Sequence, residues 1–569
     1  MHSPLDLVGF KIYREIAENF PISSASDEFF YFPQATNSDP DWSVWDRFSP
    51  EVITELAGKL SGWENEIDNI LSKAQPQEKT TAKNPFALVR CQRLDDRDQQ
   101  KQRIIGSTLS AHERQKTFCR SAQDDADPAE LRLLKKVVRT LREHLVYIRV
   151  WETQPSLYLT ITCLGLAESL EQGLRQAGQR ALTLPQFLDQ AGWNLKNVPA
   201  FFRDVGLEMI KDTRAYLTML QEQLPHLAAA LDALDRFEDK LKTVSLHSGF
   251  RLPEEQLSLV IEKHINCGMS IAQTAEALDG EIEDVNRTLA QEARTMGFKT
   301  WPEAYASISL PDLGHDGLVG LYRDEVLRLG RHCRQIGLVS DRLNQANPVK
   351  VMPVPEYLSA IRAASSYSIG PGHPPAGGVF YVLKADDPAK SQKESLREFR
   401  ILAAHETWPG HHLLDINRWS LGSPVLRAVE QPLFYEGWAC FAEEMLGMTG
   451  YTTAPGDRLM VAKRRLWRAI RGKVDLGLQT GTMSMEKAVF MLTRTGMNPE
   501  QARSSARKYV LNPGYQLCYT LGLRYFMNLY ELYGCTDITW FARIVLNHGQ
   551  ICFQDLERIL QIKNTSSLQ

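Results

Sequence analysis

Cysteine is scarce and unpaired in this sequence of 569 residues. Its nine cysteines are scattered without a Cys-x-x-Cys pair, and their odd number argues against a disulfide framework. The opening residues 1–7 have neither the basic stretch nor the apolar stretch of a signal peptide. We therefore expect the protein to work in the reducing cytoplasm.

Long apolar runs and a marked charge excess are also lacking. The apolar stretch at 157–167 is too short to cross a bilayer and is broken by Thr and Gly. The net charge of −4 provides no general attraction to nucleic acid or to an anionic membrane. We expect neither as a partner.

Most of the sequence carries a helical pattern instead. Between 128 and 243, apolar residues recur at spacings of three and four, the stripe by which an amphipathic helix packs on a core. Residues 247–253, with Gly249 and Pro253, interrupt this pattern. The chain is long enough for two lobes. We expect a mainly α fold, a large multi-helix body with a deep cleft, divided into an N-terminal helical lobe (1–245) and a C-terminal helical lobe (246–569).

Two short helices are predicted after this break, one starting at Ser270 and the next at Glu281. Their spacing resembles a helix-turn-helix unit. The second helix is not strongly basic, so a plain helical hairpin is favoured over DNA binding.

Residues 351–384 depart from the helical pattern. Residues 369–378 are rich in Gly and Pro, and residues 379–383 (Val-Phe-Tyr-Val-Leu) have strand composition. The free edge of this strand, a small β element, could pair with the backbone of an extended peptide, with Tyr381 among the substrate-binding residues. The alternative is a short hairpin that only caps the core.

Three of the 13 histidines fall within eight residues of the second half. Residues 404–413 read Ala-His-Glu-Thr-Trp-Pro-Gly-His-His-Leu. Imidazoles and carboxylates are usual ligands of zinc. A helical zinc hydrolase normally carries His-Glu-x-x-His, because a spacing of four puts both imidazoles on one face while the Glu activates water. The spacing here is longer, and a helix end without a metal is the alternative interpretation.

Pro409 offers a physical reason for the longer spacing. It has no amide hydrogen to bond the carbonyl of His405, so the helix can bulge there and absorb extra residues. Two added residues would bring His411 to the place of the second ligand. On a straight helix His412 would lie about 10 Å from His405, too far to share one ion, so it is kept as the alternative ligand. Glu406 is the expected general base, which accepts a proton from water and passes one to the leaving amine.

The string His-Glu-x-x-Pro-Gly-His-His resembles the signature of the bacterial domain-of-unknown-function 885 family. That family is grouped with mostly helical zinc peptidases of the gluzincin type. The resemblance continues through much of the second half and is weak in the first 240 residues. It implies a zinc cofactor (Zn2+) and hydrolysis of peptides.

The third ligand is expected on a second helix. Glu436 follows His412 by 24 residues, a distance that allows two helices to pack against each other. In the family a Glu-Gly-Trp-Ala string occupies this place, and the resemblance implies that Glu436 binds the metal. Glu443 is two turns further along the same face and could orient a metal-bound histidine from behind.

Residues 463–473 contain six basic residues and no acid. A solvated basic face is the simplest interpretation. The segment also resembles the family's Arg-Ala-x-Arg…Asp-x-Gly string, which lines its cleft, so Arg468 or Arg471 could hold a substrate carboxylate by two parallel hydrogen bonds. The chain departs from the family at Gln479, where a His is common, which puts that contact in doubt.

Residues 512–522 resemble the family's Pro-Gly-Gln-Ala…Tyr-x-x-Gly string. Tyr519 matches directly, and its hydroxyl would stabilise the oxyanion of the transition state. Tyr515 stands where the family has Gln, and Gln516, one place later, is a candidate substrate-binding residue.

These features favour a zinc-dependent metallopeptidase, of carboxypeptidase or oligopeptidase type, that hydrolyses small peptides and that could form a homodimer. One alternative is a non-catalytic binding protein with a degenerate metal site. Another is a di-iron carboxylate protein, although such sites usually need paired Glu-x-x-His motifs.

Overall fold

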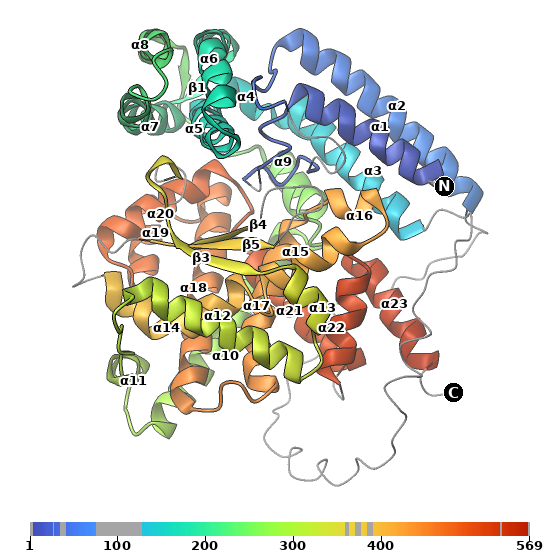
Figure 1. Cartoon of the computed structure of the whole chain (residues 1–569), viewed down its shortest axis with the longest axis vertical. Coiled ribbons are helices and arrows are strands. Elements are labelled where there is room, and N and C mark those ends of the chain that lie inside the picture. The colour runs from blue at the N-terminus through green and yellow to red at the C-terminus, as the bar shows by residue number, and fades with distance from the viewer. Residues whose placement is uncertain are drawn as a thin grey trace.

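The structure is a computed structural model that describes residues 4–26, 28–34, 41–74, 128–358, 364–369, 377–383, 391–534 and 537–566. Helices dominate these residues, so the expected mainly α fold is confirmed (Figure 1). The helices before residue 250 are α1 (Pro4–Asn19), α2 (Pro50–Ala74), α3 (Pro128–Glu143), the π-helix η3 (His144–Ile148), α4 (Val150–Thr153), α5 (Pro155–Gln172), α6 (Leu174–Asn194), α7 (Ala200–Leu220) and α8 (Leu227–Thr243).

The later helices cover most of the second half. They are α9 (Glu254–Leu259), η4 (Val260–His264), α10 (Ile271–Thr295), α11 (Trp301–Ser307), α12 (Gly317–Gln335), α13 (Asp341–Ala346), η5 (Glu356–Leu358), α14 (Ser391–Glu406), α15 (His411–Ser420), α16 (Pro424–Ala428), α17 (Pro432–Met448), α18 (Pro455–Thr480), α19 (Met485–Thr493), α20 (Pro499–Leu511), α21 (Leu517–Leu529), η6 (Tyr530–Gly534), α22 (Ile538–Asn547) and α23 (Phe553–Ser566).

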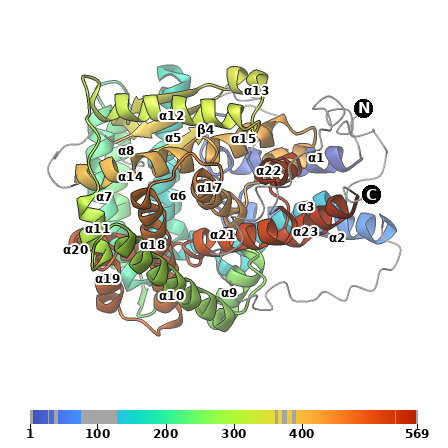
Figure 2. The same ribbon diagram turned by 90° about the horizontal axis from the view of Figure 1, so that it is seen from below.

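The arrangement has two groups of N-terminal helices above a larger C-terminal body. In Figure 1, α5–α8 form one group and α1–α3 the other, with a small sheet and the C-terminal helices below them. Figure 2 shows α17, α18 and α21 near the middle of the molecule, where α17 packs on α21 and α10 packs on α18. One large apolar core draws residues from both halves of the chain. The lobe boundary at 245/246 and the deep cleft stay predictions.

The two short helices predicted after Ser270 are a single helix, α10, in the structure. Ser270 caps α10 through a capping box with Gln273, as a helix start requires. Glu281, however, lies inside the same helix and forms an ion pair with Arg465 of α18. Packing on α18 therefore carries the helix through a stretch that looks like a second start, and the structure has no helical hairpin between 271 and 295.

Two glycines bring α17 and α21 into backbone contact. A Cβ on Gly437 would lie 2.6 Å from the Cα of Gly522, a distance that no side chain tolerates. The two helices therefore approach at a place where neither has a side chain. This contact sets Glu436 of α17 beside Tyr519 of α21.

The strands form two small sheets. β1 (Val198–Pro199) pairs in parallel with β2 (Leu246–His247). The larger sheet, directly before α14, has the order β3-β5-β4, with β3 (Val349–Pro353) parallel and β4 (Ser366–Ile369) antiparallel to β5 (Gly378–Val382).

The predicted free edge at residues 379–383 is wrong, because β5 is the central strand and is paired on both sides. Pairing order depends on contacts between distant segments and leaves no mark in the composition of one strand. Tyr381 is buried in a small cluster with Ala167 of α5. Phe380, on the other face, packs on Tyr322. A substrate-binding role for Tyr381 therefore gains no support.

No helix among the described residues is both long enough and apolar enough to pass through a membrane.

Candidate metal centre

The break between α14 and α15 contains two residues more than a continuous helix would have. Gly410 N donates to Ala404 O at 3.0 Å and Leu413 N to Thr407 O at 3.4 Å, so each bond spans six residues where an α-helix spans four. This agrees with the two-residue insertion predicted from Pro409. Gly410 is needed there, because a Cβ would lie 1.9 Å from the carbonyl oxygen of His405.

The insertion brings together three side chains selected from the sequence. His405 Nε2 and His411 Nε2 each lie 3.6 Å from Glu436 Oε2. The three residues are buried, and their ligand atoms all lie within 4.8 Å of one another. Ligands about 2 Å from a tetrahedral ion are about 3.3 Å apart, so a small inward movement would complete the cluster.

Glu436 shows that these residues fit a cation. Its Oε2, which faces both imidazoles, is buried and has no hydrogen-bond partner within the described chain. A buried carboxylate oxygen without a partner is unfavourable unless an ion or water satisfies it. Burial would raise the pKa of Glu436, but the adjacent His405 and His411 hold it well below its usual value. Two imidazoles and one carboxylate are also a known ligand set of catalytic zinc.

The structure places His412, the alternative ligand, outside this cluster. Its Nδ1 lies 3.2 Å from the Tyr367 hydroxyl and its Nε2 lies 3.0 Å from the carbonyl oxygen of Asn347. Both nitrogens are therefore engaged, and burial lowers the pKa of His412 to about 3. His412 ties α15 to β4 and to Asn347, two residues before β3.

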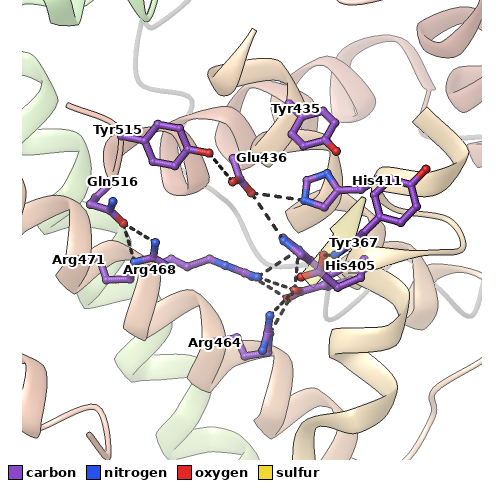
Figure 3. A network of polar contacts seen from close by, with 12 residues as sticks. Tyr367, His405, His411, Tyr435, Glu436, Arg464, Arg468, Arg471, Tyr515 and Gln516 are labelled. Atoms are coloured by element: carbon purple, nitrogen blue, oxygen red, sulfur yellow. Dashed lines mark hydrogen bonds and ion pairs between the residues drawn. The ribbon is translucent and has the colours of Figure 1, made fainter. Parts of the chain in front are cut away.

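A buried charged network holds His405 from behind (Figure 3). Glu443 Oε1 lies 3.1 Å from His405 Nδ1. Arg468 donates to both carboxylate oxygens of Glu443, at 2.7 and 2.6 Å, and Arg464 Nε donates at 3.1 Å. Burial would raise the pKa of Glu443, but Arg464 and Arg468 hold it well below its usual value. If a cation were held at Nε2, the proton of His405 would lie on Nδ1, where Glu443 could accept it.

The simplest interpretation of residues 463–473, a solvated basic face, is wrong. Arg464, Arg468 and Arg471 are all buried. The acids that pair with the first two, Glu398 and Glu443, come from α14 and α17. Helical spacing cannot show such distant partners. Arg468 is occupied by Glu443, so its predicted role on a substrate carboxylate gains no support.

Two tyrosines lie on the other side of Glu436. Tyr515 donates from its hydroxyl to Glu436 Oε1 at 2.9 Å, and the Tyr519 hydroxyl interacts with both Glu436 and Arg471. Burial and the Glu436 charge raise the pKa values of both phenols well above the usual value. From the sequence, Tyr515 was identified only as a departure from the family. It lies in the turn before α21, and its short spacing of four residues from Tyr519 was the signal for it.

A residue from the N-terminal half also reaches this site. The ring of Phe30 lies 5.9 Å from the ring of Tyr515, centroid to centroid. Nothing in the sequence indicated this contact.

Glu406 and Gln516 have defined partners. Glu406 is half-buried, and its Oε2 accepts a hydrogen bond from Tyr367 N at 2.9 Å, so an edge strand orients the expected general base. Gln516 accepts from Arg471 Nε at 2.8 Å. Gln479, by contrast, bonds the backbone of Leu252 and Val510 and lies among structural contacts.

The fold and the site define a mainly α protein in which three helices bring two imidazoles and one carboxylate to a common point. The model of a family of bacterial proteins of unknown function (DUF885) matches residues 44–560, and the chain therefore belongs to this family.

Two solved structures share the fold. One is described as a "putative lipoprotein of unknown function" from Shewanella oneidensis, with a TM-score of 0.70, 15% identity, and coverage of 98% of this chain and 100% of that one. The other is described as a "putative lipoprotein" from Colwellia psychrerythraea, with a TM-score of 0.73, 15% identity, and coverage of 99% of each chain. No match was found among the curated proteins.

Proposed function

We propose that this protein is a zinc-dependent peptidase of the gluzincin type that hydrolyses small peptides. The observation that carries this proposal is the convergence of His405, His411 and Glu436, together with the buried Oε2 of Glu436, which has no hydrogen-bond partner among the described residues and faces both imidazoles. These three residues would hold the zinc ion, and Glu443 would position His405. When bound, the ion would supply a Lewis acid that polarises a carbonyl and makes water more acidic.

Each remaining residue of the site has a task in this proposal. Glu406, oriented by the Tyr367 amide, accepts a proton from the attacking water and returns one to the leaving amine. Tyr515 holds Oε1 of Glu436 and so leaves Oε2 directed at the imidazoles. Tyr519 stabilises the negative charge that develops on the substrate oxygen.

The other functions weighed from the sequence are less well supported. A di-iron protein needs ligands for two ions, whereas the described residues contain a single cluster of three. A binding protein with a degenerate site remains the main competitor, and loss of turnover on changing Glu406 separates it from a peptidase. The cytoplasmic location and the homodimer stay predictions, to be tested by cell fractionation and by analytical ultracentrifugation.

The deciding experiment is a digest of a random peptide library by the zinc-loaded protein, with products identified by mass spectrometry. We expect zinc-dependent cleavage, and we expect Glu406→Gln to lower kcat by roughly 10²- to 10⁴-fold. Its zinc content and circular dichroism should match the parent protein.

Glu283→Gln is the matched control, because Glu283 is an exposed residue of α10. It should cleave at the parent rate. If the zinc-loaded protein cleaves no peptide, or if Glu406→Gln cleaves as fast as the parent, the peptidase proposal is wrong.

A further inference from the structure

Arg471 is a buried cation without an acidic partner. Its side chain is 8% exposed as part of α18, and no carboxylate among the described residues lies within ion-pair distance of it. Its polar contacts are with neutral groups: the amide oxygen of Gln516 accepts from Nε and Nη2, and the Tyr519 hydroxyl also interacts with the guanidinium. A buried charge without an opposite charge is unfavourable, so such a residue is expected to receive one from outside the chain.

The neighbouring arginines differ in this respect. Arg464 pairs with Glu398 and Glu443, and Arg468 pairs with Glu443. Arg465, on the same helix, pairs with Glu281 and Glu444. Among these four arginines, Arg471 alone has no carboxylate of the described residues within ion-pair distance, and the charges of Glu436 and Asp475 act on it only from farther away.

The guanidinium of Arg471 is also fixed in one orientation. Its central carbon lies 4.4 Å from the ring centroid of Trp467 and 4.2 Å from that of Tyr519. Rings at these distances hold a guanidinium in place by stacking. Gln516 occupies only the side formed by Nε and Nη2. The other side, formed by Nη1 and Nη2, can also pair with the two oxygens of a carboxylate.

Arg471 is close to the point where hydrolysis is proposed. The side chain of Tyr519 interacts with Arg471 and with Glu436, so one tyrosine separates the guanidinium from a proposed zinc ligand. In a peptide, the carbonyl of the last peptide bond and the terminal carboxylate are one residue apart, and successive Cα atoms are about 3.8 Å apart. The shared contact with Tyr519 places the guanidinium and the metal centre in the same part of the molecule, as binding of a peptide's C-terminal end at both would require.

We infer that Arg471 binds the free C-terminal carboxylate of a peptide, which makes the protein a carboxypeptidase that shortens peptides from that end. This inference rests on the proposed function, because it places the substrate in the same site. The chemistry it assigns is a bidentate ion pair between the Nη1 and Nη2 groups and the terminal carboxylate. A peptide whose C-terminus is an amide lacks the charge and one acceptor oxygen.

The test is a binding measurement that does not depend on turnover. Acetyl-tetraalanine and its C-terminal amide are titrated into zinc-loaded Glu406→Gln protein by isothermal calorimetry. We expect the acid to bind roughly 10- to 100-fold more tightly than the amide, as for a hydrogen-bonded charged group. Adding Arg471→Gln should bring the acid to the affinity of the amide and leave the affinity of the amide unchanged.

Arg458→Gln is the matched control, because Arg458 lies on the same helix in a half-exposed ion pair with Glu292. It should preserve the preference for the acid. Equal binding of acid and amide, or a preference that survives Arg471→Gln, would overturn the inference even if the protein is a peptidase. If the parent protein cleaves nothing yet binds the acid through Arg471, the role of Arg471 in binding C-termini stands, and the peptidase proposal fails together with the assignment as a carboxypeptidase.

Discussion

Glu443 connects His405 to the rest of the protein. It contacts Nδ1 of His405 and is fixed by two arginines of α18, so the imidazole is held with Nε2 toward Glu436. An imidazole whose second nitrogen donates to a carboxylate is a better and more precisely placed ligand. The geometry therefore gives Glu443 a positioning role that its place in the sequence only suggested.

We predict that Glu443→Gln weakens zinc binding by roughly 10- to 100-fold, because a neutral amide oxygen accepts more weakly from Nδ1 and no longer neutralises Arg464 and Arg468. Competition with a fluorescent chelator measures this change. Glu444→Gln is the control, since Glu444 is the next residue and pairs with Arg465 on α18. An equal loss of affinity in both variants would mean that the effect is general destabilisation.

At the scale of single residues, the sequence predicted which residues form the site better than it predicted what surrounds them. His405, His411 and Glu436 were selected from ligand chemistry, Pro409 and a family resemblance, and the structure brings them together. The burial of Arg471 was not predicted, because the rings and helices that cover it lie elsewhere in the chain. Tyr515 could have been found from its spacing to Tyr519.

At the scale of elements, the contact between α17 and α21 sets the position of Glu436 relative to the two tyrosines. We predict that Gly437→Ala destabilises the protein by about 1–3 kcal/mol, because the new Cβ meets the backbone of Gly522, which cannot move aside. Urea unfolding followed by circular dichroism measures the change.

Gly447→Ala is the control on the same helix. A Cβ there meets nothing within 4 Å, so the substitution should stabilise α17 by about 0.5–1 kcal/mol. Equal behaviour of the two variants would show that the glycine contact has no special role.

The helices, and the break at Pro409, were accessible from sequence because periodicity and proline act locally. The strand order β3-β5-β4 could not be predicted from the sequence, since three short segments can pair in several ways and tertiary contacts decide between them. The prediction of a second helix start at Glu281 was wrong for the same reason, because packing on α18 outweighed the local signal.

For the whole molecule, the proposed ion would join α14, α15 and α17. We predict that free zinc at about 100 times its Kd stabilises the folded protein by about 2.7 kcal/mol, and that chelation lowers the Tm accordingly. Differential scanning fluorimetry with and without EDTA measures this shift. His411→Ala should lose the response to zinc, whereas Glu283→Gln should keep it. A zinc response that persists in His411→Ala would place the ion elsewhere.

The contact of Phe30 with Tyr515 has a consequence for how the protein can be divided. A recombinant fragment starting at residue 246 would retain both imidazoles and all the carboxylates of the candidate metal centre. It would also retain the charged network of α18. It would nonetheless lack Phe30, so the ring of Tyr515, which donates a hydrogen bond to Glu436, would be uncovered on one side. The smallest working unit is therefore expected to include the N-terminal segment, and truncation at the apparent lobe boundary should yield an impaired protein.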